Sequence, residues 1–397
     1  MPSRLPDPGR HPGDADRRSD GRALNLLLIR LRLIGDVVFT TPAIAALRRR
    51  YPDARLTYLV EDAPEPLVRH NPHLDEVIVV DRPRGWRRVA YDLLLARRLR
   101  AKRFDVVVDF HGGPRAAWLA RATGAPRRIG YALPWRTWAY TERLPWTRAL
   151  VPPRHSVLNQ WDLVAPLGVG PADPAVDPVE IVEDPAAARR VHERLAAAKV
   201  APHAPLVVLH VSASNPFRRW PRESFAEVAA ALAVEDPRRR IIISSGPSEA
   251  EAADEVARLA QRKAGAQSAS IVRCGEFDLL ELRTLVGRAS LFVGGDTGPL
   301  HVASATRTPI VALFGPTLPD RSMPWRAPAH AAVAVDAGPL PCRPCHQRHC
   351  VPGDFRCLTR ITPREVLAAA TRAMGDRTRE SGADSRRSVT RPTGNSQ

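Results

Sequence analysis

The stretch at 290–317, SLFVGGDTGPLHVASATRTPIVALFGPT, constrains the fold of this chain most. It contains an apolar run, a Gly-rich turn, a helical run, a second apolar run and a closing Gly-Pro. Uninterrupted apolar runs are typical of strands buried on both faces of a parallel sheet. A strand that leads through a Gly turn into a helix also suits phosphates, because free N–H groups and the helix dipole point at the turn. The stretch therefore predicts a parallel α/β sheet with an anion site at a strand end.

Five residues of this turn are candidate site residues: Asp296, Thr297, Gly298, Pro299 and His301. Pro299 suits a first helical position, where no N–H is needed. The alternative interpretation is an ordinary strand-to-helix turn with a helix cap. An acid, a hydroxyl, glycines and a His between two apolar strands favour a binding site.

The rest of the chain repeats the strand and helix alternation in two series. A stretch rich in Pro and acidic residues at 171–185 predicts a linker. Apolar runs alternate with helical patterns at 23–170 and again at 186–375, which predicts a parallel sheet in each part. The polar ends at 1–22 and 376–397 predict disordered tails. The length of 397 residues also favours two domains.

Two segments of the first series carry more specific expectations. The residues LIGD at 33–36 follow the first apolar run and predict a turn. The segment at 86–102 has apolar residues at helical spacing, Val89, Leu93 and Leu94, with Arg on the other face. We therefore expect an amphipathic helix there.

Positive charge is concentrated in one part of the chain. The net charge is +17, yet 1–22 contributes only +1 and 376–397 only +2. Residues 82–154 hold 17 Lys or Arg against 4 acidic residues, a net of +13. Such a field attracts nucleic acid, anionic lipid or a phosphorylated glycolipid. The alternative is a composition biased toward Arg. No apolar run approaches the ~18 residues needed to span a bilayer, and 1–22 lacks the apolar core of a secretory signal, so we expect a cytoplasmic protein.

Four motifs resemble those of a known family. They are I-R-L-R-L-I-G-D-V-V-F-T-T-P-A, R-R-W-P, D-T-G-P-L-H-V-A-S-A and C-R-P-C-H-Q-R-H-C. In this order they resemble the ADP-heptose:lipopolysaccharide heptosyltransferases, glycosyltransferase family 9, over roughly 24–372. The resemblance implies a GT-B fold, in which two Rossmann-like doubly wound domains face a cleft. The N-terminal domain would bind the acceptor and the C-terminal domain the nucleotide sugar. The implied activity is inverting transfer of a heptose or related sugar from an ADP-sugar to the lipopolysaccharide inner core, with no cofactor required.

Asp36 is the candidate catalytic base. It follows the first predicted strand, and by resemblance it matches the Gly-Asp acid proposed as general base in the family. The alternative is an Asp that caps the following helix. Thr40, Thr41 and His111 are candidate acceptor-binding residues, and the two Thr would otherwise serve as caps.

The loop SASNPFRRWP and the following turn supply further donor-binding candidates. Ser212 can donate to phosphate oxygens, and Arg218 stands where the family commonly carries a phosphate-binding Lys. Arg keeps the positive charge and adds a bidentate fork. We interpret Arg219 as a solvated surface charge. By resemblance an acid after the next strand binds the ribose; Glu249 is preferred, with Glu251 the alternative. Acids in the first turn of a helix are also favoured by its dipole.

The cysteine cluster raises a metal site. Four of the five cysteines lie in the segment 342–357: Cys342, Cys345, Cys350 and Cys357. Four thiols this close are candidate zinc ligands, although the second pair lacks C-x2-C spacing. Reduced thiols that pack a loop, or local disulfides, are the alternatives. By resemblance the cluster is most like that of the heptosyltransferase II type.

The expected partners follow from the same resemblance. They are an ADP-sugar donor, an anionic lipid A–core acceptor and, peripherally, the cytoplasmic face of the inner membrane. We expect a monomer that binds no nucleic acid. Two alternatives remain at this point: another GT-B sugar-nucleotide enzyme such as an epimerase, and a basic, non-catalytic α/β protein that binds nucleic acid. The latter lacks stacking aromatics in a recognised module.

Overall fold

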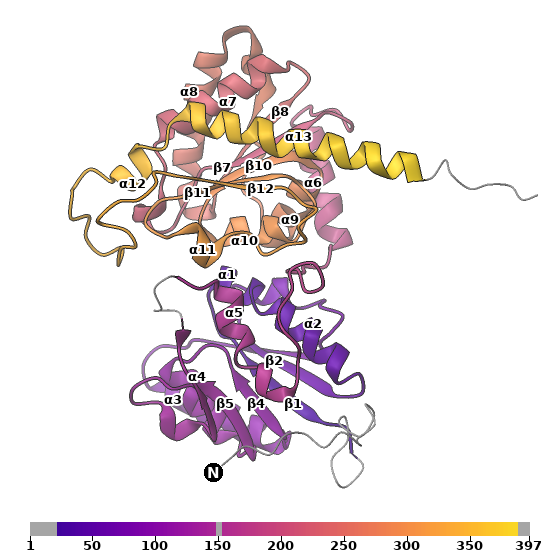
Figure 1. The fold of residues 1–397 in the computed structure, drawn as a ribbon, viewed down its shortest axis with the longest axis vertical. Helices are drawn as coiled ribbons and strands as arrows, with labels where there is room; N and C mark the ends of the chain where they lie inside the picture. The colour runs from indigo at the N-terminus through magenta and orange to yellow at the C-terminus, as the bar shows by residue number, and fades with distance from the viewer. Residues whose placement is uncertain (1–21, 148–152, 388–397) are drawn as a thin grey trace, which may run out of the picture. The chain divides into compact units, whose positions relative to one another are not determined.

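The structure is a computed structural model that describes residues 22–147 and 153–387. The expected tail at 1–22 lies almost wholly outside these residues. The chain divides into two compact units between Val182 and Glu183, inside the predicted linker. Each unit is built around one six-stranded parallel sheet (Figure 1). The predicted α/β class is thereby confirmed.

The sheet of unit 1 has the strand order β3-β2-β1-β4-β5-β6. Its strands are β1 (Asn25–Ile29), β2 (Arg55–Glu61), β3 (Glu76–Val80), β4 (Val106–Asp109), β5 (Arg127–Tyr131) and β6 (Glu142–Leu144). The central strands β1 and β4 are buried along nearly their whole length, as their continuous apolar runs predict. The winding direction reverses between β1 and β4. In open parallel sheets ligands bind at the carboxyl ends of the strands beside such a reversal.

Helices cover both faces of this sheet (Figure 1). They are α1 (Ile34–Val38), α2 (Thr41–Arg50), α3 (Trp86–Ala101), α4 (Pro114–Ala122) and α5 (Ser156–Trp161), with 3-10 turns η2 (Glu65–Leu67), η3 (Thr137–Ala139) and η5 (Ala165–Leu167). One face of the sheet packs against Leu47 of α2 and Trp161 of α5. The other packs against Leu95 of α3 and Leu119 of α4. The turn predicted at 33–36 is instead the start of α1, whose buried Val37 and Val38 pull it against the unit.

Helix α3 presents a different face to the core from the predicted one. Val89, Leu93 and Leu94 are exposed, whereas Leu95 and Leu99 are buried. The helix has apolar residues on two sides, so periodicity alone does not choose between them. Neighbouring side chains on α4 decide it, because Arg115 hydrogen-bonds to Asp92 at 2.5 and 3.0 Å on the side of Leu95 and Leu99.

The sheet of unit 2 has the order β12-β11-β10-β7-β8-β9. Its strands are β7 (Leu206–His210), β8 (Arg240–Ser244), β9 (Ile271–Val272), β10 (Ala289–Gly295), β11 (Ile310–Phe314) and β12 (Ala332–Asp336). Its helices are α6 (Pro185–Ala197), α7 (Arg222–Glu235), α8 (Ala250–Ala264), α9 (Leu279–Gly287), α10 (Gly298–Ser304), α11 (Pro319–Ser322), α12 (Arg356–Thr359) and α13 (Pro363–Arg387), with 3-10 turns η6 (Pro216–Arg218), η7 (Pro247–Glu249) and η8 (Gly265–Ser270). α7, α8 and α13 pack on one face, and α6, α9 and α10 on the other. The stretch at 290–317 forms β10, α10 and β11 as predicted.

The last helix is longer than expected. α13 continues to Arg387, so the stretch from 376, predicted to be a disordered tail, begins as helix. Arg, Ala and Glu favour helix, and the stretch to 387 contains no Pro, which explains the continuation. Val366 and Ala370 anchor the helix on the sheet of unit 2. Residues 388–397 lie outside the described part of the chain.

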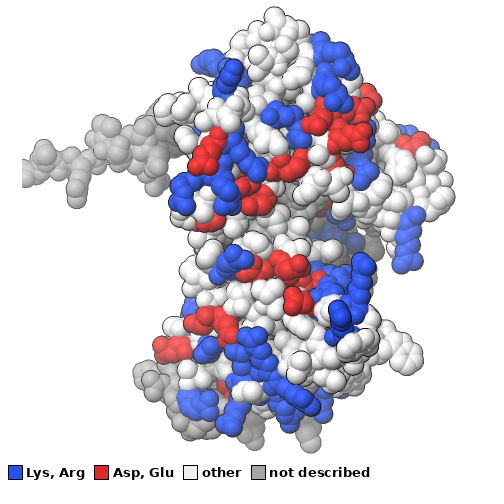
Figure 2. Space-filling model, turned by 180° about the vertical axis from the view of Figure 1, so that it is seen from behind, with Lys and Arg blue, Asp and Glu red and all other residues white. Residues whose placement is uncertain are grey.

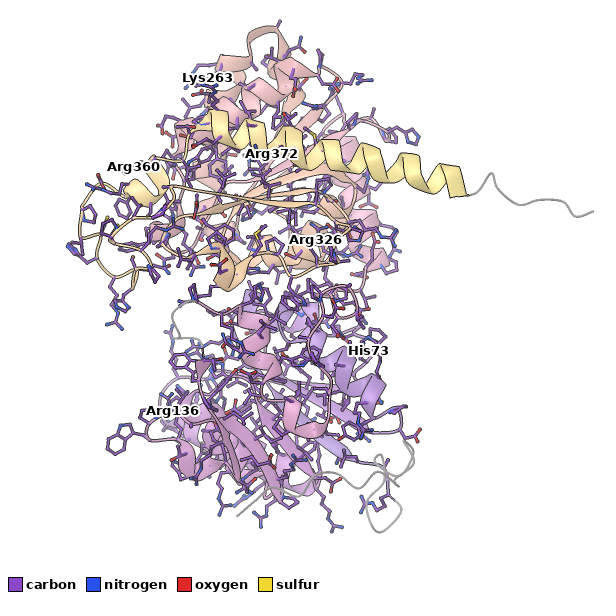
Figure 3. All side chains as sticks on the ribbon, in the orientation of Figure 1. His73, Arg136, Lys263, Arg326, Arg360 and Arg372 are labelled. Carbon is purple, nitrogen blue, oxygen red and sulfur yellow. The ribbon has the colours of Figure 1, made fainter. Side chains whose placement is uncertain are left out.

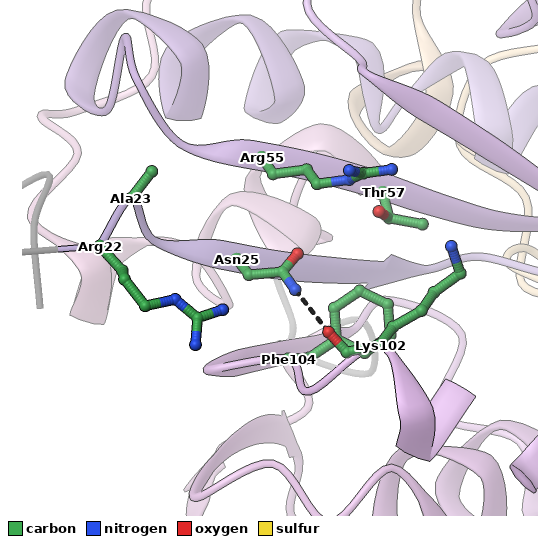
Figure 4. Close-up of a pocket in the computed structure, with 7 residues that line it drawn as sticks. All are labelled: Arg22, Ala23, Asn25, Arg55, Thr57, Lys102 and Phe104. Atoms are coloured by element: carbon green, nitrogen blue, oxygen red, sulfur yellow. Dashed lines mark hydrogen bonds between the residues drawn. The ribbon is translucent and has the colours of Figure 1, made fainter. Parts of the chain in front are cut away.

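A pocket of about 440 Å³ lies at the amino end of the unit 1 sheet. Figure 4 shows it beside the starts of β1 and β2, where the Asn25 amide donates to the Lys102 carbonyl at 2.9 Å. Its cations are already paired, since Lys102 and Arg55 lie 2.7 and 3.0 Å from Glu76. The pocket opens at the edge opposite to the carboxyl ends of the strands, so it does not contain the candidate residues.

A matched pair of substitutions tests the orientation of α3. Leu95→Ala removes a side chain that is 5% exposed and should lower the free energy of unfolding by about 2–4 kcal/mol. Leu94→Ala removes a neighbouring exposed side chain and should change it by less than about 0.5 kcal/mol. Urea denaturation followed by circular dichroism measures both. Equal losses would contradict this orientation, and a larger loss for Leu94→Ala would place α3 the other way round.

Candidate functional site

The carboxyl edge of the unit 1 sheet holds an acid paired with an Arg. Asp36 lies in the first turn of α1, and its carboxylate forms an ion pair with Arg30, which directly follows β1. The guanidinium of Arg30 also donates to the carbonyl of Phe110, beyond the end of β4. Gln160 of α5 donates to the backbone carbonyl of Asp36 at 3.2 Å. These contacts hold Asp36 where the sheet changes its winding direction.

His111 lies at the same edge, just after β4. Its backbone N–H and that of Gly112 donate to the buried carboxylate of Asp109 at 2.9 and 3.0 Å, and the Tyr140 hydroxyl donates to that carboxylate at 2.6 Å. Burial, together with the nearby charge of Arg30, lowers the pKa of His111 to about 4, so its imidazole is neutral at pH 7.

The ring of His111 depends on a neighbouring glycine. A Cβ on Gly113 would lie 2.7 Å from the ring, closer than real contacts allow. The buried Nδ1 atom of His111 has no hydrogen-bond partner among the described residues. A neutral imidazole can hydrogen-bond a substrate hydroxyl without carrying charge, although the buried Nδ1 itself is closed off from solvent.

Thr40 and Thr41 are fully buried. The Thr40 hydroxyl donates to the carbonyl of Val37 at 2.6 Å and lies 2.7 Å from the hydroxyl of Tyr58. The Thr41 hydroxyl donates to Val38 at 2.8 Å and accepts from the backbone N–H of Glu180 at 2.9 Å. Both hydroxyls therefore have partners inside unit 1, and contact with an acceptor stays a prediction.

In unit 2, Asp296 is the centre of a polar network after β10. Its carboxylate accepts a hydrogen bond from the Thr317 hydroxyl and lies 3.3 Å from Arg218 and 3.6 Å from His301. Burial alone would raise the pKa of Asp296, but His301, Arg218 and Thr317 outweigh it and hold the pKa at about 2. The carboxylate is therefore ionised throughout the physiological range.

Arg218 lies in η6 and is held on two sides. Its guanidinium donates to the carbonyl of Asp296 at 2.6 Å and to the side chain of Gln347 at 2.8 Å. Gln347 also accepts from Asn215 at 2.9 Å. A Cβ on Gly295 would lie 3.3 Å from the carbonyl oxygen of Arg218, so this glycine lets the loop approach β10 closely.

Trp220 anchors the same loop to the unit. It is buried, and its indole N–H donates to the carbonyl of Ile361 at 3.0 Å. Its ring packs edge-on against Phe225, with the ring centroids 4.8 Å apart. The R-R-W-P motif thus combines a buried anchor with two cationic residues. This explains how a loop can hold Arg218 at a defined position.

The remaining donor candidates are also partnered. Ser212 accepts from the backbone N–H of Gly246 at 2.8 Å and hydrogen-bonds with the buried His210 at 3.1 Å. Glu249 forms an ion pair with Arg219 at 2.8 Å. Arg219 is half exposed, as a solvated surface charge would be, and it also has a partner, because Glu249 follows β8 and reaches it. Glu251 is exposed at the start of α8.

Helix α10 begins directly after Asp296. Thr297 is its cap residue, Gly298 and Pro299 open it, and His301 is buried. The Thr297 hydroxyl donates back to the carbonyl of Gly295 at 3.3 Å instead of capping the helix. N–H groups of a first helical turn have no partner within the helix. The turn therefore joins a buried acid, two glycines and helix N–H groups, as the sequence predicts.

The four cysteines of the segment 342–357 are not grouped around a common point in the part of the chain that the structure describes. Within the described ranges, no three His, Cys, Asp or Glu side chains are grouped to hold a metal ion, and the four cysteines are free thiols. The zinc site raised by their spacing is therefore not seen. The segment instead supplies Gln347 to Arg218, and its Arg343 donates to the carbonyl of Thr317 at 2.9 Å.

The sequence-based candidates omit several residues of these networks, among them Arg30, Gln160, Thr317 and Gln347. The sequence could have identified Arg30 as a site residue, because an Arg directly after a buried strand lies at the carboxyl edge of the sheet. Thr317 closes the 290–317 stretch and follows β11, the neighbour of β10. Gln160 and Gln347 reach the site from distant loops and helices, and no local pattern marks them.

Comparisons with known proteins agree with this arrangement. Lipopolysaccharide heptosyltransferase 3 of Escherichia coli is 27% identical to this chain, with 87% of this chain and 97% of that protein covered. A family 9 glycosyl transferase from Veillonella parvula superposes with a TM-score of 0.76 at 24% identity, over 88% of this chain and 97% of the other. The E. coli ADP-heptose lipopolysaccharide heptosyltransferase II gives a TM-score of 0.71 at 20% identity, over 89% and 100%.

These structures share the two-sheet fold, which is the predicted GT-B type. The sequence relative is a type 3 enzyme and one structural relative a type II enzyme, so the predicted likeness to type II in particular stays a prediction. Residues 93–354 match the sequence model of Glycosyltransferase family 9 (heptosyltransferase), and the match covers well over half of the chain. The chain belongs to glycosyltransferase family 9.

Proposed function

We propose that this glycosyltransferase moves a heptose or a related sugar from an ADP-sugar to the lipopolysaccharide inner core, with inversion at the anomeric carbon. The sugar and the acceptor class rest on relatives that are named as heptosyltransferases. The observation that carries the proposal is the network around Asp296. It gathers Arg218, Thr317 and His301 at the motif that resembles the family's signature.

Unit 2 binds the donor in this proposal. Arg218 faces the diphosphate, where a fixed guanidinium favours the negative charge that develops on the leaving group. The N–H groups of Thr297 and Gly298 and the hydroxyl of Ser212 add hydrogen bonds to phosphate oxygens. Glu249 binds the ribose hydroxyls and exchanges its contact with Arg219 for them. Asp296 orients Arg218 and His301, and its low pKa keeps it charged while it does so.

Unit 1 supplies the base and binds the acceptor. The acceptor hydroxyl loses its proton to Asp36, its oxygen bonds to the anomeric carbon, and the bond from that carbon to the diphosphate breaks, which leaves ADP. Arg30 fixes the position of the Asp36 carboxylate. The neutral ring of His111, which is half-buried at this edge of the sheet, hydrogen-bonds a sugar hydroxyl of the acceptor.

The acceptor proposal also gives the basic region a role. Residues 82–154 carry a net charge of +13, which suits an acceptor rich in phosphate and acidic sugars. Among the described residues no helix is long and apolar enough to cross a membrane. On the ground of the acceptor class and this positive charge, we propose peripheral association with the cytoplasmic face of the inner membrane. A monomeric enzyme that binds no nucleic acid stays part of this proposal.

Asp36→Asn should reduce transfer by at least about a hundredfold, because the amide cannot take the acceptor proton. Binding of the ADP-sugar should change by less than about twofold, since the substitution lies in unit 1. Transfer assays and calorimetry on the same preparation measure the two effects. Glu76→Gln is the matched control, because Glu76 is an ion-paired carboxylate at the opposite edge of the same sheet. Wild-type turnover in Asp36→Asn would remove Asp36 as the base.

Arg218→Ala should weaken ADP binding by about 1.5–3 kcal/mol, through the loss of a charge-assisted contact to phosphate. Arg218→Lys should lose less, because the positive charge remains. Calorimetric titration with ADP compares the two with wild type. Arg222→Ala is the control, since Arg222 is an exposed Arg of the following helix, paired with Glu255. Identical ADP affinity in all four proteins contradicts the assignment.

Asp296→Asn should change the acid stability of the protein. The folded-state pKa of about 2 lies below the ordinary value near 3.9, so Asp296 stabilises the fold above about pH 4 and loses this contribution as the pH falls toward 2. The variant should be less stable by on the order of 2 kcal/mol at pH 7, with a shallower loss of stability between about pH 4 and 2. Urea unfolding across this range measures the slope. Asp254→Asn, at a half-exposed ion pair, is the control and should leave the slope of stability against pH unchanged. Parallel slopes for Asp296→Asn and wild type would contradict the role of the network.

A further inference from the structure

Helix α3 has a second apolar face that no described residue covers. Trp86, Val89, Leu93 and Leu94 are 77, 62, 50 and 63% exposed. Their spacing places them on one side of the helix, opposite to Leu95, which packs on the sheet. We call these four residues the α3 outer face. An exposed apolar stripe of this kind on a helix marks an interaction surface.

Unpaired cations border the α3 outer face. Arg87, Arg97 and Arg98 are exposed, and none of them forms an ion pair with a described acidic residue. Of the arginines along this helix, Arg88 is the one with a nearby acid, Asp92 at 3.9 Å. Figure 2 shows Lys and Arg over much of one face of unit 1, where Asp and Glu are also present. The stripe therefore lies within a strongly positive field.

Two exposed tryptophans lie in the same layer of unit 1. Trp135 is 94% and Trp138 54% exposed in the loop at 132–138, which we call the Trp loop. α4 contacts both α3 and η3, the turn in which this loop ends. Ala139 and Leu95 belong to one core cluster on one face of the sheet.

The Trp loop is held in a defined conformation. Trp135 has a φ of +62°, in the left-handed region that a bulky residue seldom adopts. The indole N–H of Trp138 donates to the carbonyl of Trp135 at 3.0 Å, and Arg136, labelled in Figure 3, donates to the carbonyl of Gly112 at 3.1 Å. The strained backbone presents an indole to solvent with no gain in buried area, which makes this indole a candidate for contact with a partner outside the chain.

The chemistry of this surface fits a bilayer best. Aliphatic and Trp side chains on one side of a helix, with Arg beside them, are typical of helices that lie in a membrane interface. The net charge of +13 selects anionic lipid. A second copy would bring two strongly positive faces together, which repel each other. Nucleic acid would leave the aliphatic side chains of the stripe without partners.

We propose that the α3 outer face and the Trp loop dock unit 1 on an anionic phospholipid bilayer. The apolar side chains enter the boundary between headgroups and acyl chains, and Arg87, Arg97 and Arg98 contact lipid phosphates. This inference adds a membrane-docking surface to the proposed glycosyltransferase, and its role in the cell rests on that proposed function. The docking itself needs neither donor nor acceptor.

Vesicle flotation with the full chain tests the proposal. Vesicles of phosphatidylcholine with about one-third phosphatidylglycerol should carry the protein up the gradient, and pure phosphatidylcholine should carry at least about fivefold less. Salt at about 0.5 M should reduce the difference, because it screens exposed charges. Absence of flotation with the anionic vesicles, or equal flotation with both kinds, overturns the proposal.

Two sets of substitutions locate the surface. Leu93→Ser with Leu94→Ser should lower the bound fraction at least about tenfold, because these side chains enter the interface. Arg87→Gln, Arg97→Gln and Arg98→Gln together should remove the preference for anionic lipid. Val234→Ser with Arg262→Gln, on exposed positions of unit 2, is the matched control and should bind as wild type does. Melting curves check that each variant is folded. Trp135→Ser with Trp138→Ser tests the Trp loop separately from the helix and should also lower the bound fraction.

The other occupants of this surface give distinct results. Wild-type binding in the α3 variants overturns the proposal, and so does a concentration-dependent dimer that the Leu substitutions dissociate without any effect on flotation. Arg substitutions that abolish DNA binding but leave vesicle binding unchanged overturn it as well. The proposed transfer is tested separately, because Asp36→Asn should float like wild type. A failure of docking therefore leaves the transfer assay intact, and the reverse also holds.

Discussion

The ion pair of Arg218 with Asp296 is the interaction on which the rest of unit 2's candidate site depends. Asp296 is almost fully buried, and an unpaired buried carboxylate would be costly, so the charge and hydrogen bonds around it must be in place for the fold to form. They come from the η6 loop, from α10 and from the end of β11. Trp220 anchors the η6 loop in the core, and Gly295, which has no side chain, leaves space for the loop to approach the acid. A single buried charge thereby connects α10 to the η6 loop and to the end of β11.

Unit 1 uses the same device at its own carboxyl edge. Arg30 connects Asp36 to the backbone beyond β4, and Gln160 holds the backbone of α1 from a distant helix. In both units an arginine and an acid meet just past the central strands. The winding direction of the sheet reverses there, which leaves room for a ligand at the carboxyl ends of the strands. The two edges differ in what they offer. Unit 2 presents fixed cationic and N–H groups that suit phosphate, whereas unit 1 presents a carboxylate and a neutral imidazole that suit hydroxyls.

Helix α3 illustrates why an apolar pattern does not by itself identify a core. Leu95 and Leu99 make one apolar side and the α3 outer face makes another, so the helix satisfies a helical period in two directions. The structure buries the side that carries Asp92, because Arg115 of α4 pairs with that acid. The surplus apolar side remains in contact with solvent beside arginines. Apolar side chains in contact with water are unfavourable, so this surface is better explained as a contact for a partner.

The sequence by itself determined the α/β class, the two series of strands and helices, and the central place of the 290–317 stretch. These follow from local patterns: apolar runs, helical spacing, Gly turns and a Pro-rich linker, each confined to neighbouring residues. It also determined the motif positions that identify the family. Only the tertiary structure decided which side of α3 is buried, that Thr40 and Thr41 are internal, and that Arg219 pairs with Glu249. It likewise decided that Gln347 reaches Arg218 and that the cysteines are not grouped as ligands within the described residues. Those outcomes depend on contacts between segments tens or hundreds of residues apart, and no local pattern records which distant side chain arrives.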